Sequence, residues 1–398
     1  MIYLDGHSTT PLAPEVFEAM KPFFLERFGN ASQGLHRYNW EARAGVDQAR
    51  ERVASALGVR EREIVFTSGA TEANHLALLG SVPALLASGK KRILSIRIEH
   101  ASVLGALELM EERGCRVDWI RTDGAGRVDF EHLRSLMSDD VGLVSVALAN
   151  HEIGTLQDLK RISDLARAHG SRVHTDAVQA FGKVRFTADS IGADLVTISS
   201  HKIRGPKGIG ALYVRRKNPR IELEPLYLGG GQERGLRPGT PDTPAIVGFG
   251  LAAELSVQNL DREVERLSRL RDRLWFRLSG SIDGWVRNSP PDGLPNNLNL
   301  SIEGVDGAAL FGRLKQVAVS NASACLNGVQ DYSQVLTELG VGRDLARATM
   351  RFGLGTWNTE TEIDAAATEI VEVVRDLRTM ERRFAEQTGT FSMNGEKL

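Results

Sequence analysis

Residues 194–216, DLVTISSHKIRGPKGIGALYVRR, contain the pattern that decides the fold. Two apolar runs, 194–198 and 210–215, indicate strands buried on both faces, because they hardly alternate with polar residues. A polar turn follows the first run and contains Lys202. Ligands of open α/β sheets bind at the carboxyl ends of such strands. The segment therefore predicts an α/β fold and makes Lys202 a candidate site residue.

The same alternation of short apolar runs and helical patterns extends over residues 60–216. Strands separated by amphipathic helices indicate a mostly parallel sheet with right-handed crossovers. We therefore expect a mostly parallel seven-stranded sheet flanked by helices. The expected strands are 63–67, 92–98, 116–121, 142–149, 172–175, 194–198 and 210–215.

The pattern changes after residue 250. Apolar residues recur every three or four positions over 260–278, opposite a face rich in Arg, Glu and Asp, which predicts a long amphipathic helix connecting two domains. A strand is expected at 298–302, a helix beginning at Asp306, and helices at 343–348 and 360–380. We expect a large domain over 14–255, a smaller α+β domain built from 1–13 and 256–385, and a mobile tail over 386–398.

Composition excludes several classes of protein. The 398 residues include 49 Lys and Arg against 51 Asp and Glu, so the formal net charge is −2, and we expect no direct nucleic-acid partner. The only cysteines are Cys115 and Cys325, which excludes a disulfide framework and an all-cysteine metal site. All nine histidines lie at or before His201 without a metal-binding spacing, so no metal is expected. Without a signal pattern or a membrane-spanning apolar run, a cytoplasmic protein is the simplest expectation.

A candidate anion site lies at TSGATE, residues 67–72, between an expected strand and an expected helix. Small residues there allow backbone N–H groups to surround an anion at the positive end of the helix dipole. The alternative is an ordinary N-cap in which Ser68 or Thr71 satisfies those N–H groups. The chain has neither GxGxxG nor GxxxxGK[ST], so the dinucleotide and P-loop motifs are absent.

Three further positions carry chemistry. Asp176 follows a buried strand and could pair with a cationic ring nitrogen or cap a helix. Lys202 lies where desolvation would lower the pKa of its amine and favour Schiff-base chemistry, although most lysines are simply solvated. Cys325, in the polar run SNASACLNG, is a candidate nucleophile, whereas Cys115 has no assigned role. The loop 229–240, GGGQERGLRPGT, could bring Thr240 or an arginine to an anion, or contact another subunit.

Eight blocks, in this order along the chain, resemble the cysteine desulfurases of the NifS/IscS type, which are pyridoxal-phosphate (PLP) enzymes of the class V aminotransferase group. The blocks are SGATEAN at 68–74, EH at 99–100, ANHEIG at 149–154, TDAVQ at 175–179, SSHKIRGPKGIGALYV at 199–214, the 229–240 loop, SACLNG at 323–328 and MRFGLG at 350–355. The resemblance implies the PLP-dependent transferase fold type I.

The resemblance also implies how PLP would be held. Lys202 would bind it covalently, Asp176 would pair with the pyridinium nitrogen, and Gln179 would hydrogen-bond the phenolate oxygen. His100 would stack on the ring and act in proton transfer. The phosphate would be held by Ala70, Thr71, Ser199 and His201, and by Thr240 of a second subunit, which implies a homodimer.

For the substrate, the resemblance implies that Asn150 and Arg351 position L-cysteine and that Cys325 is the nucleophile. The products would be L-alanine and a persulfide on Cys325, which would pass sulfur to an iron–sulfur scaffold or a tRNA-thiolation protein. Alternatives are a selenocysteine lyase, another aminotransferase or lyase of fold type I, and a non-catalytic sulfur-relay scaffold. The chain departs from the family pattern at His7-Ser8-Thr9, where NAT is usual, at GNASQ (29–33), and after Cys325, where Leu326 and Asn327 replace small hydroxyl residues.

Overall fold

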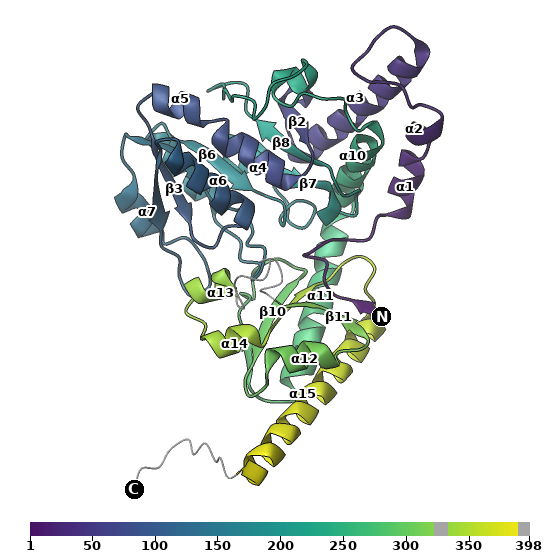
Figure 1. Cartoon of the computed structure of the whole chain (residues 1–398), viewed down its shortest axis with the longest axis vertical. Helices are drawn as coiled ribbons and strands as arrows, with labels where there is room; N and C mark the ends of the chain where they lie inside the picture. The colour runs from purple at the N-terminus through teal and green to yellow at the C-terminus, as the bar shows by residue number, and fades with distance from the viewer. Residues whose placement is uncertain (322–332, 389–398) are drawn as a thin grey trace.

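The computed structural model describes residues 1–321 and 333–388, with side chains up to residue 384 (Figure 1). Cys325 and residues 389–398 of the expected tail lie outside the described residues. The described part contains a seven-stranded sheet, a four-stranded sheet and a two-stranded sheet. No helix in this part is long and apolar enough to cross a membrane.

The seven-stranded sheet has the strand order β2-β8-β7-β6-β5-β3-β4. All its pairings are parallel except those of β8, which runs antiparallel to both β2 and β7. This confirms the expected mostly parallel sheet. Its strands are β2 Ile64–Thr67, β3 Arg92–Ile96, β4 Arg116–Ile120, β5 Val141–Ser145, β6 Arg172–Asp176, β7 Leu195–Ser199 and β8 Gly210–Val214.

The apolar run expected as a strand over 142–149 forms a strand only as far as Ser145. Its remaining apolar residues are buried in a loop, and the backbone N–H of Val146 bonds to the carbonyl of His174 in the next strand. Hydrophobicity alone therefore overestimated this strand, because a buried loop and a buried strand have the same composition.

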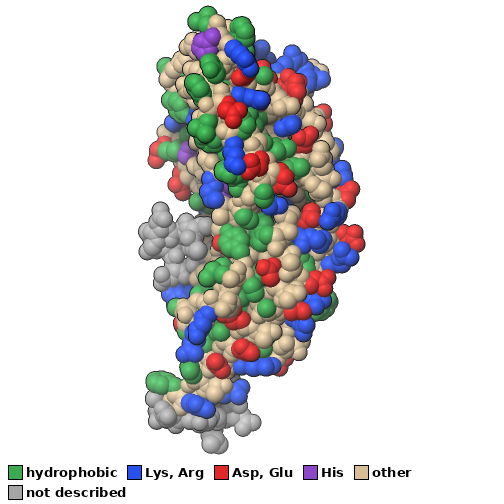
Figure 2. All heavy atoms as spheres, turned by 90° about the vertical axis from the view of Figure 1, so that its right-hand side faces the viewer, with side chains coloured by type: hydrophobic (Ala, Val, Ile, Leu, Met, Phe, Trp, Pro, Cys, Tyr) green, Lys and Arg blue, Asp and Glu red, His purple; other side chains and the backbone are tan. Residues whose placement is uncertain are grey.

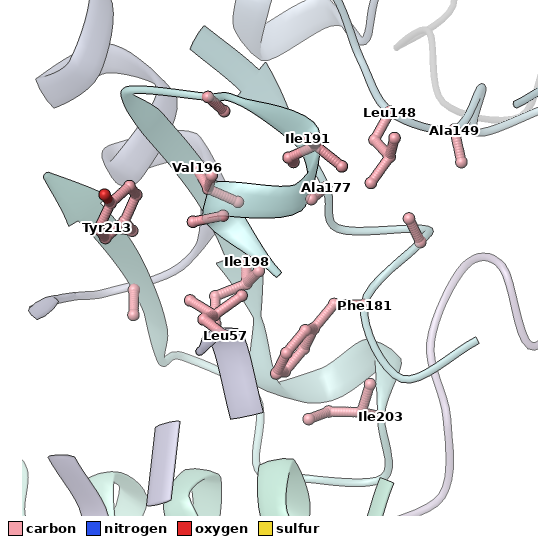
Figure 3. Packing of buried hydrophobic residues seen from close by; sticks show 14 of the residues in the cluster. Leu57, Leu148, Ala149, Ala177, Phe181, Ile191, Val196, Ile198, Ile203 and Tyr213 are labelled. Atoms are coloured by element: carbon pink, nitrogen blue, oxygen red, sulfur yellow. The ribbon is translucent and has the colours of Figure 1, made fainter. Parts of the chain in front are cut away.

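The central sheet is buried on both faces. Val196 and Ile198 of β7 lie in a core cluster with Leu57 (Figure 3). Leu195 belongs to a separate cluster with Leu76. Since successive side chains of a strand point to opposite faces, the two clusters lie on opposite sides of the sheet. Helices α3 Arg37–Leu57 and α10 Thr243–Gln258 pack together on the first side, and α4 Ala70–Leu79 with α6 Ala101–Glu112 on the second.

The expected long helix after residue 250 is confirmed as α11 Leu260–Ser279, which packs against α15 Glu360–Thr388 (Figure 1). Both contribute to a further core cluster with the four-stranded antiparallel sheet β12-β13-β10-β9. Asp306 is the N-cap of α12, as expected. The elements of this region are β9 Trp285–Arg287, β10 Asn297–Ile302, α12 Gly307–Arg313, β11 Val317–Ala318, β12 Ser320–Asn321, α13 Gln334–Glu338, α14 Arg343–Arg347 and β13 Thr349–Gly353.

The N-terminal segment packs against this C-terminal region. Strand β1 Ile2–Tyr3 pairs in parallel with β11, and Asp5 bridges to Gly353 of β13. Glycine is needed at 353, because a Cβ there would lie 2.4 Å from the backbone nitrogen of His7. The domain limits expected from the sequence stay a prediction.

The remaining helices are α1 Pro14–Met20, α2 Pro22–Leu25, α5 Val82–Ala87, α7 Phe130–Leu136, α8 Leu159–Ala168, α9 Ala188–Ile191 and the 3₁₀ turns Glu61–Glu63, Ser200–Lys202 and Gln232–Gly235.

Candidate active site

A cavity of about 580 Å³ lies where the carboxyl ends of β6 and β7 meet the N-termini of α4 and α6. Residues far apart in the sequence, from the N-terminal segment and from β13, complete its wall. The cavity brings together nine residues that the resemblance assigned to PLP or substrate: Ala70, Thr71, His100, Asp176, Gln179, Ser199, His201, Lys202 and Arg351.

The N-terminus of α4 opens toward this cavity. Its N-cap is Gly69, which makes no side-chain capping bond and has open space where a Cβ would be. The expected alternative, a cap by Ser68 or Thr71, is therefore wrong: the backbone N–H of Ser68 instead donates to Glu72 Oε2 over 2.6 Å. Uncapped N–H groups at a helix N-terminus attract an anion. The cradle fits a phosphate group.

Asp176 ends β6 and is buried at the cavity wall. Its Oδ1 accepts from the N–H of Val178 over 2.9 Å, and its Oδ2 accepts from Asn74 Nδ2 over 2.8 Å. The alternative of a helix cap is wrong, because turns rather than a helix follow Asp176. The two donors stabilise a carboxylate here, which suits pairing with a protonated ring nitrogen.

Lys202 lies in the 3₁₀ turn after β7, and its side chain is half-buried rather than on an open surface. Its Nζ donates to the backbone carbonyls of His7 and Ser8, the latter over 2.7 Å. The N-terminal segment thus holds the amine at the wall of the cavity. The alternative of a simply solvated lysine is wrong.

His100 caps α6, and its Nδ1 accepts from the backbone N–H of Ser102 over 3.1 Å. The ring proton of the neutral imidazole is therefore on Nε2. Burial lowers the pKa of His100 most, against an opposing effect of the Asp176 charge. The ring of His151 packs edge-on against it at 5.2 Å between centroids. A neutral His100 can both stack on a ring and accept or donate a proton.

Arg351 comes from β13 and is only 3% exposed. Its Nη2 donates to Ser8 Oγ over 2.9 Å, and its Nη1 donates to the carbonyl of His151 over 3.3 Å. Its Nε is buried, and the described residues offer it no hydrogen-bond acceptor. A buried guanidinium with a donor to spare, at a cavity wall, suits a substrate carboxylate.

The structure does not bring Asn150 and Thr240 into the described cavity wall. Asn150 Nδ2 donates to the carbonyl of Ile98, and its Oδ1 accepts from the N–H groups of Glu152 and Ile153, so its polar atoms shape the loop beside the cavity. Thr240 is exposed, in the loop before α10. The roles assigned to both residues stay predictions.

Three residues in or beside the cavity were not among the candidates expected from the sequence. His151 and His7 line the cavity, and burial is the main reason why the pKa of each lies well below its usual range. Glu99 lies behind the wall, where its Oε1 accepts from the N–H of Ala147 over 2.6 Å and burial raises its pKa to about 8. The blocks ANHEIG and EH contained His151 and Glu99, but nothing in the blocks showed their burial.

Within residues 1–321 and 333–388, no cluster of His, Cys, Asp or Glu could hold a metal ion.

Comparison with known proteins agrees with this geometry. The sequence model of the family Aminotransferase class-V matches residues 2–366. The chain is 42% identical over 380 residues to the mitosomal cysteine desulfurase of Encephalitozoon cuniculi, covering 95% of this chain and 88% of that protein. It is 42% identical over 378 residues to the cysteine desulfurase IscS of Rickettsia akari, covering 95% and 92%.

Among solved structures, a NifS-like protein superimposes with a TM-score of 0.87 at 34% identity, covering 94% of this chain and 100% of the other. The likeness therefore extends over the central sheet and the C-terminal region alike. The chain belongs to the class-V aminotransferase family, among the cysteine desulfurases of the IscS and NifS type.

Proposed function

We propose that this enzyme removes sulfur from L-cysteine with the help of PLP, leaving L-alanine and a persulfide on Cys325. One observation carries the proposal: Lys202, Asp176, Arg351 and the uncapped N-terminus of α4 all face one cavity. Lys202 matches the aldehyde of PLP, Asp176 its ring nitrogen and the N-terminus of α4 its phosphate, whereas Arg351 matches the carboxylate of an amino acid.

The chemistry of the residues that line the cavity fits PLP. The N-terminus of α4, with Ser199 and His201, would hold the phosphate, and Asp176 would keep the ring nitrogen protonated. His100 would stack on the ring, and Gln179 would donate to its phenolate oxygen. When bound, PLP supplies an electron sink that stabilises negative charge on the substrate Cα.

The chain's own groups would then handle the substrate. Arg351 binds the carboxylate and orients the amino acid, and Lys202 removes the proton from Cα. The Cys325 thiolate attacks the substrate sulfur, so an S–S bond forms while the Cβ–S bond breaks. The electron pair stays on Cβ, which takes up a proton to become a methyl group, and Lys202 returns a proton to Cα to complete L-alanine. His100 lies at the cavity wall to carry such protons.

We also propose that the enzyme works as a homodimer. Seven large apolar side chains between residues 17 and 40 are exposed, and we call them the apolar patch; helices α1 and α2 of this segment lie on the side of the molecule that Figure 2 faces. A second copy of the chain is the occupant we propose, because the exposed Thr240 would contact the phosphate only in a partner's site. The patch consists of Phe17, Phe24, Leu25, Phe28, Leu35, Tyr38 and Trp40.

The acceptors we propose for the persulfide are an iron–sulfur scaffold or a tRNA-thiolation protein, and the location we propose is the cytoplasm. The family resemblance supports the acceptors. The two-cysteine composition supports a reducing compartment.

The test is to incubate the PLP-loaded protein with L-cysteine and to measure alanine together with persulfide on Cys325. We expect both products, and we expect Cys325→Ala to keep the visible absorbance of bound PLP while losing both. Cys115→Ala, which changes the other cysteine, should keep full activity because Cys115 is buried away from the cavity. A protein that stays colourless with added PLP would support the scaffold alternative, and normal desulfuration by Cys325→Ala would refute the role of that cysteine.

A further inference from the structure

The ring of His7 links two parts of the molecule. It is 1% exposed and lies between Gln179, which follows β6, and Asn297 of β10. His7 Nδ1 is 2.9 Å from Gln179 Oε1, and His7 Nε2 is 3.0 Å from Asn297 Nδ2. The mechanism above uses only the backbone carbonyl of His7 and gives its imidazole no task.

The contacts of Asn297 determine which nitrogen of His7 is protonated. Asn297 Nδ2 donates to the backbone carbonyl of Glu152 over 2.9 Å, and because a carbonyl can only accept, this bond fixes the orientation of the carboxamide. The other N–H of Asn297 therefore points at His7 Nε2, which must be an unprotonated acceptor.

His7 carries one proton rather than two at neutral pH. Burial is the largest effect that lowers its pKa well below 6.5, and the nearby charges of Arg351, Lys183 and Lys202 act in the same direction, against the hydrogen bond that the ring donates to Gln179. With Nε2 unprotonated, the single proton is on Nδ1. The Nδ1–H therefore donates to Gln179 Oε1.

This bond and the backbone carbonyl of His7 together orient Gln179. With Oε1 accepting from His7, the amide nitrogen is on the other side, where one N–H donates to the backbone carbonyl of His7 over 3.1 Å. Among the residues that the structure describes, the second N–H has no acceptor, and Gln179 lines the cavity. A flipped carboxamide would instead present its carbonyl oxygen there.

We propose that His7 is a positioning residue that orients Gln179, so that an N–H and not the carbonyl meets the negatively charged ring oxygen of PLP. The inference rests on the proposed function, because it assigns a structural cause to the contact between Gln179 and the cofactor. The chain of bonds runs from the Glu152 carbonyl through Asn297 and His7 to Gln179. Each member is buried, so water does not compete for these bonds.

The holoenzyme offers a readout that is independent of turnover. The visible absorbance of bound PLP titrates with the proton that its Schiff-base nitrogen shares with the ring oxygen. A donor to that oxygen stabilises its negative charge and weakens its hold on the proton, so losing the donor raises the pKa of the chromophore. A hydrogen bond to a charged oxygen corresponds to a rise of about one to two pKa units.

Two polar variants distinguish the contribution of His7 Nδ1 from that of His7 Nε2. His7→Asn places an amide N–H near the position of Nδ1, and we expect the chromophore pKa to stay close to the wild-type value. His7→Gln reaches the position of Nε2 instead and loses the donor to Gln179, which leaves only the backbone carbonyl of residue 7 to orient the carboxamide, so we expect a rise. Gln179→Met should give a rise at least as large, and adding His7→Gln to Gln179→Met should add nothing further. His36→Gln, at an exposed histidine, is the matched control and should leave the titration unchanged.

A wild-type chromophore pKa in His7→Gln, or additive shifts in the double variant, would overturn the proposal. Failure of the proposed function has a different signature, because wild-type protein would then bind no PLP or would form neither alanine nor persulfide. A folding defect in His7→Asn or His7→Gln would lower the thermal stability of that variant before PLP is added. Thermal unfolding of the two variants without PLP therefore separates a folding defect from a change in the chromophore pKa.

Discussion

The buried carboxyl of Glu99 should make the free energy of unfolding depend on pH, and the structure gives the size of this effect. Its Oε1 accepts from the N–H of Ala147, and its Oε2 is buried without a hydrogen-bond partner among the described residues. Burial, together with the charge of Asp176, raises the pKa of Glu99 from 4.5 to about 8. The folded protein therefore keeps this group protonated under conditions in which the unfolded chain ionises it.

Proton linkage determines how the stability of the folded protein changes with pH because of Glu99. Between pH 4.5 and about 8 the folded state binds one proton more than the unfolded state at this position, so stability falls as the pH rises and levels off above the folded pKa. Each pKa unit corresponds to about 1.4 kcal/mol, so the loss over this window amounts to about 5 kcal/mol. Glu99→Gln cannot ionise and removes this loss.

The assay is equilibrium unfolding in urea at pH 5, 6, 7, 8 and 9, for wild-type and Glu99→Gln holoenzyme. The difference between the two proteins cancels every titration they share, and it should shift in favour of the variant by about 4 kcal/mol between pH 5 and 9, since part of the loss occurs below pH 5. Glu112→Gln, on the exposed face of α6, is the matched control and should run parallel to wild type. A pH-independent difference for Glu99→Gln would show that Glu99 is ionised in the folded protein and would refute the reasoning.

Two further predictions concern the substrate and the subunit contact. Arg351→Lys keeps the charge but loses the planar fork of donors, so we expect KM for L-cysteine to rise by about 10-fold or more in steady-state assays, while PLP absorbance is retained; an unchanged KM would exclude Arg351 as the carboxylate ligand. Leu35→Asp places a charge on a side chain that is 85% exposed within the apolar patch, so we expect dissociation to monomers by analytical ultracentrifugation without loss of thermal stability in the isolated chain. Phe276→Asp, at a side chain of α11 that is 70% exposed outside the patch, is the control and should leave the dimer intact.

The central sheet was predictable from the sequence because its strands are short, apolar and punctuated by turn residues. Each of the seven expected strands is present, and the errors are at the ends, as at 146–149, where a buried loop continues the apolar run of β5. The long helix α11 was predictable for the same reason, since its leucines repeat at helical spacing over five turns.

The site was only partly predictable. The blocks that contain Lys202, Asp176 and Arg351 indicated its chemistry, and the structure brings these residues to one cavity. The role of the His7 ring could not be predicted, because its partners Gln179 and Asn297 are 172 and 290 positions away. The protonation of Glu99 depends on burial, which is a property of the whole fold and leaves no local trace in the residues around it.

The N-terminal segment that holds Lys202 has a consequence for how the protein is made. Residues 2–8 are synthesised before their partners β11 and β13, which are more than 300 positions further along the chain. The strands of the large sheet are complete once β8 has been synthesised, but the part of the cavity wall that contains Arg351 forms only when β13 has been made. A nascent chain that stops before Gly353 therefore carries Lys202 without a complete cavity wall.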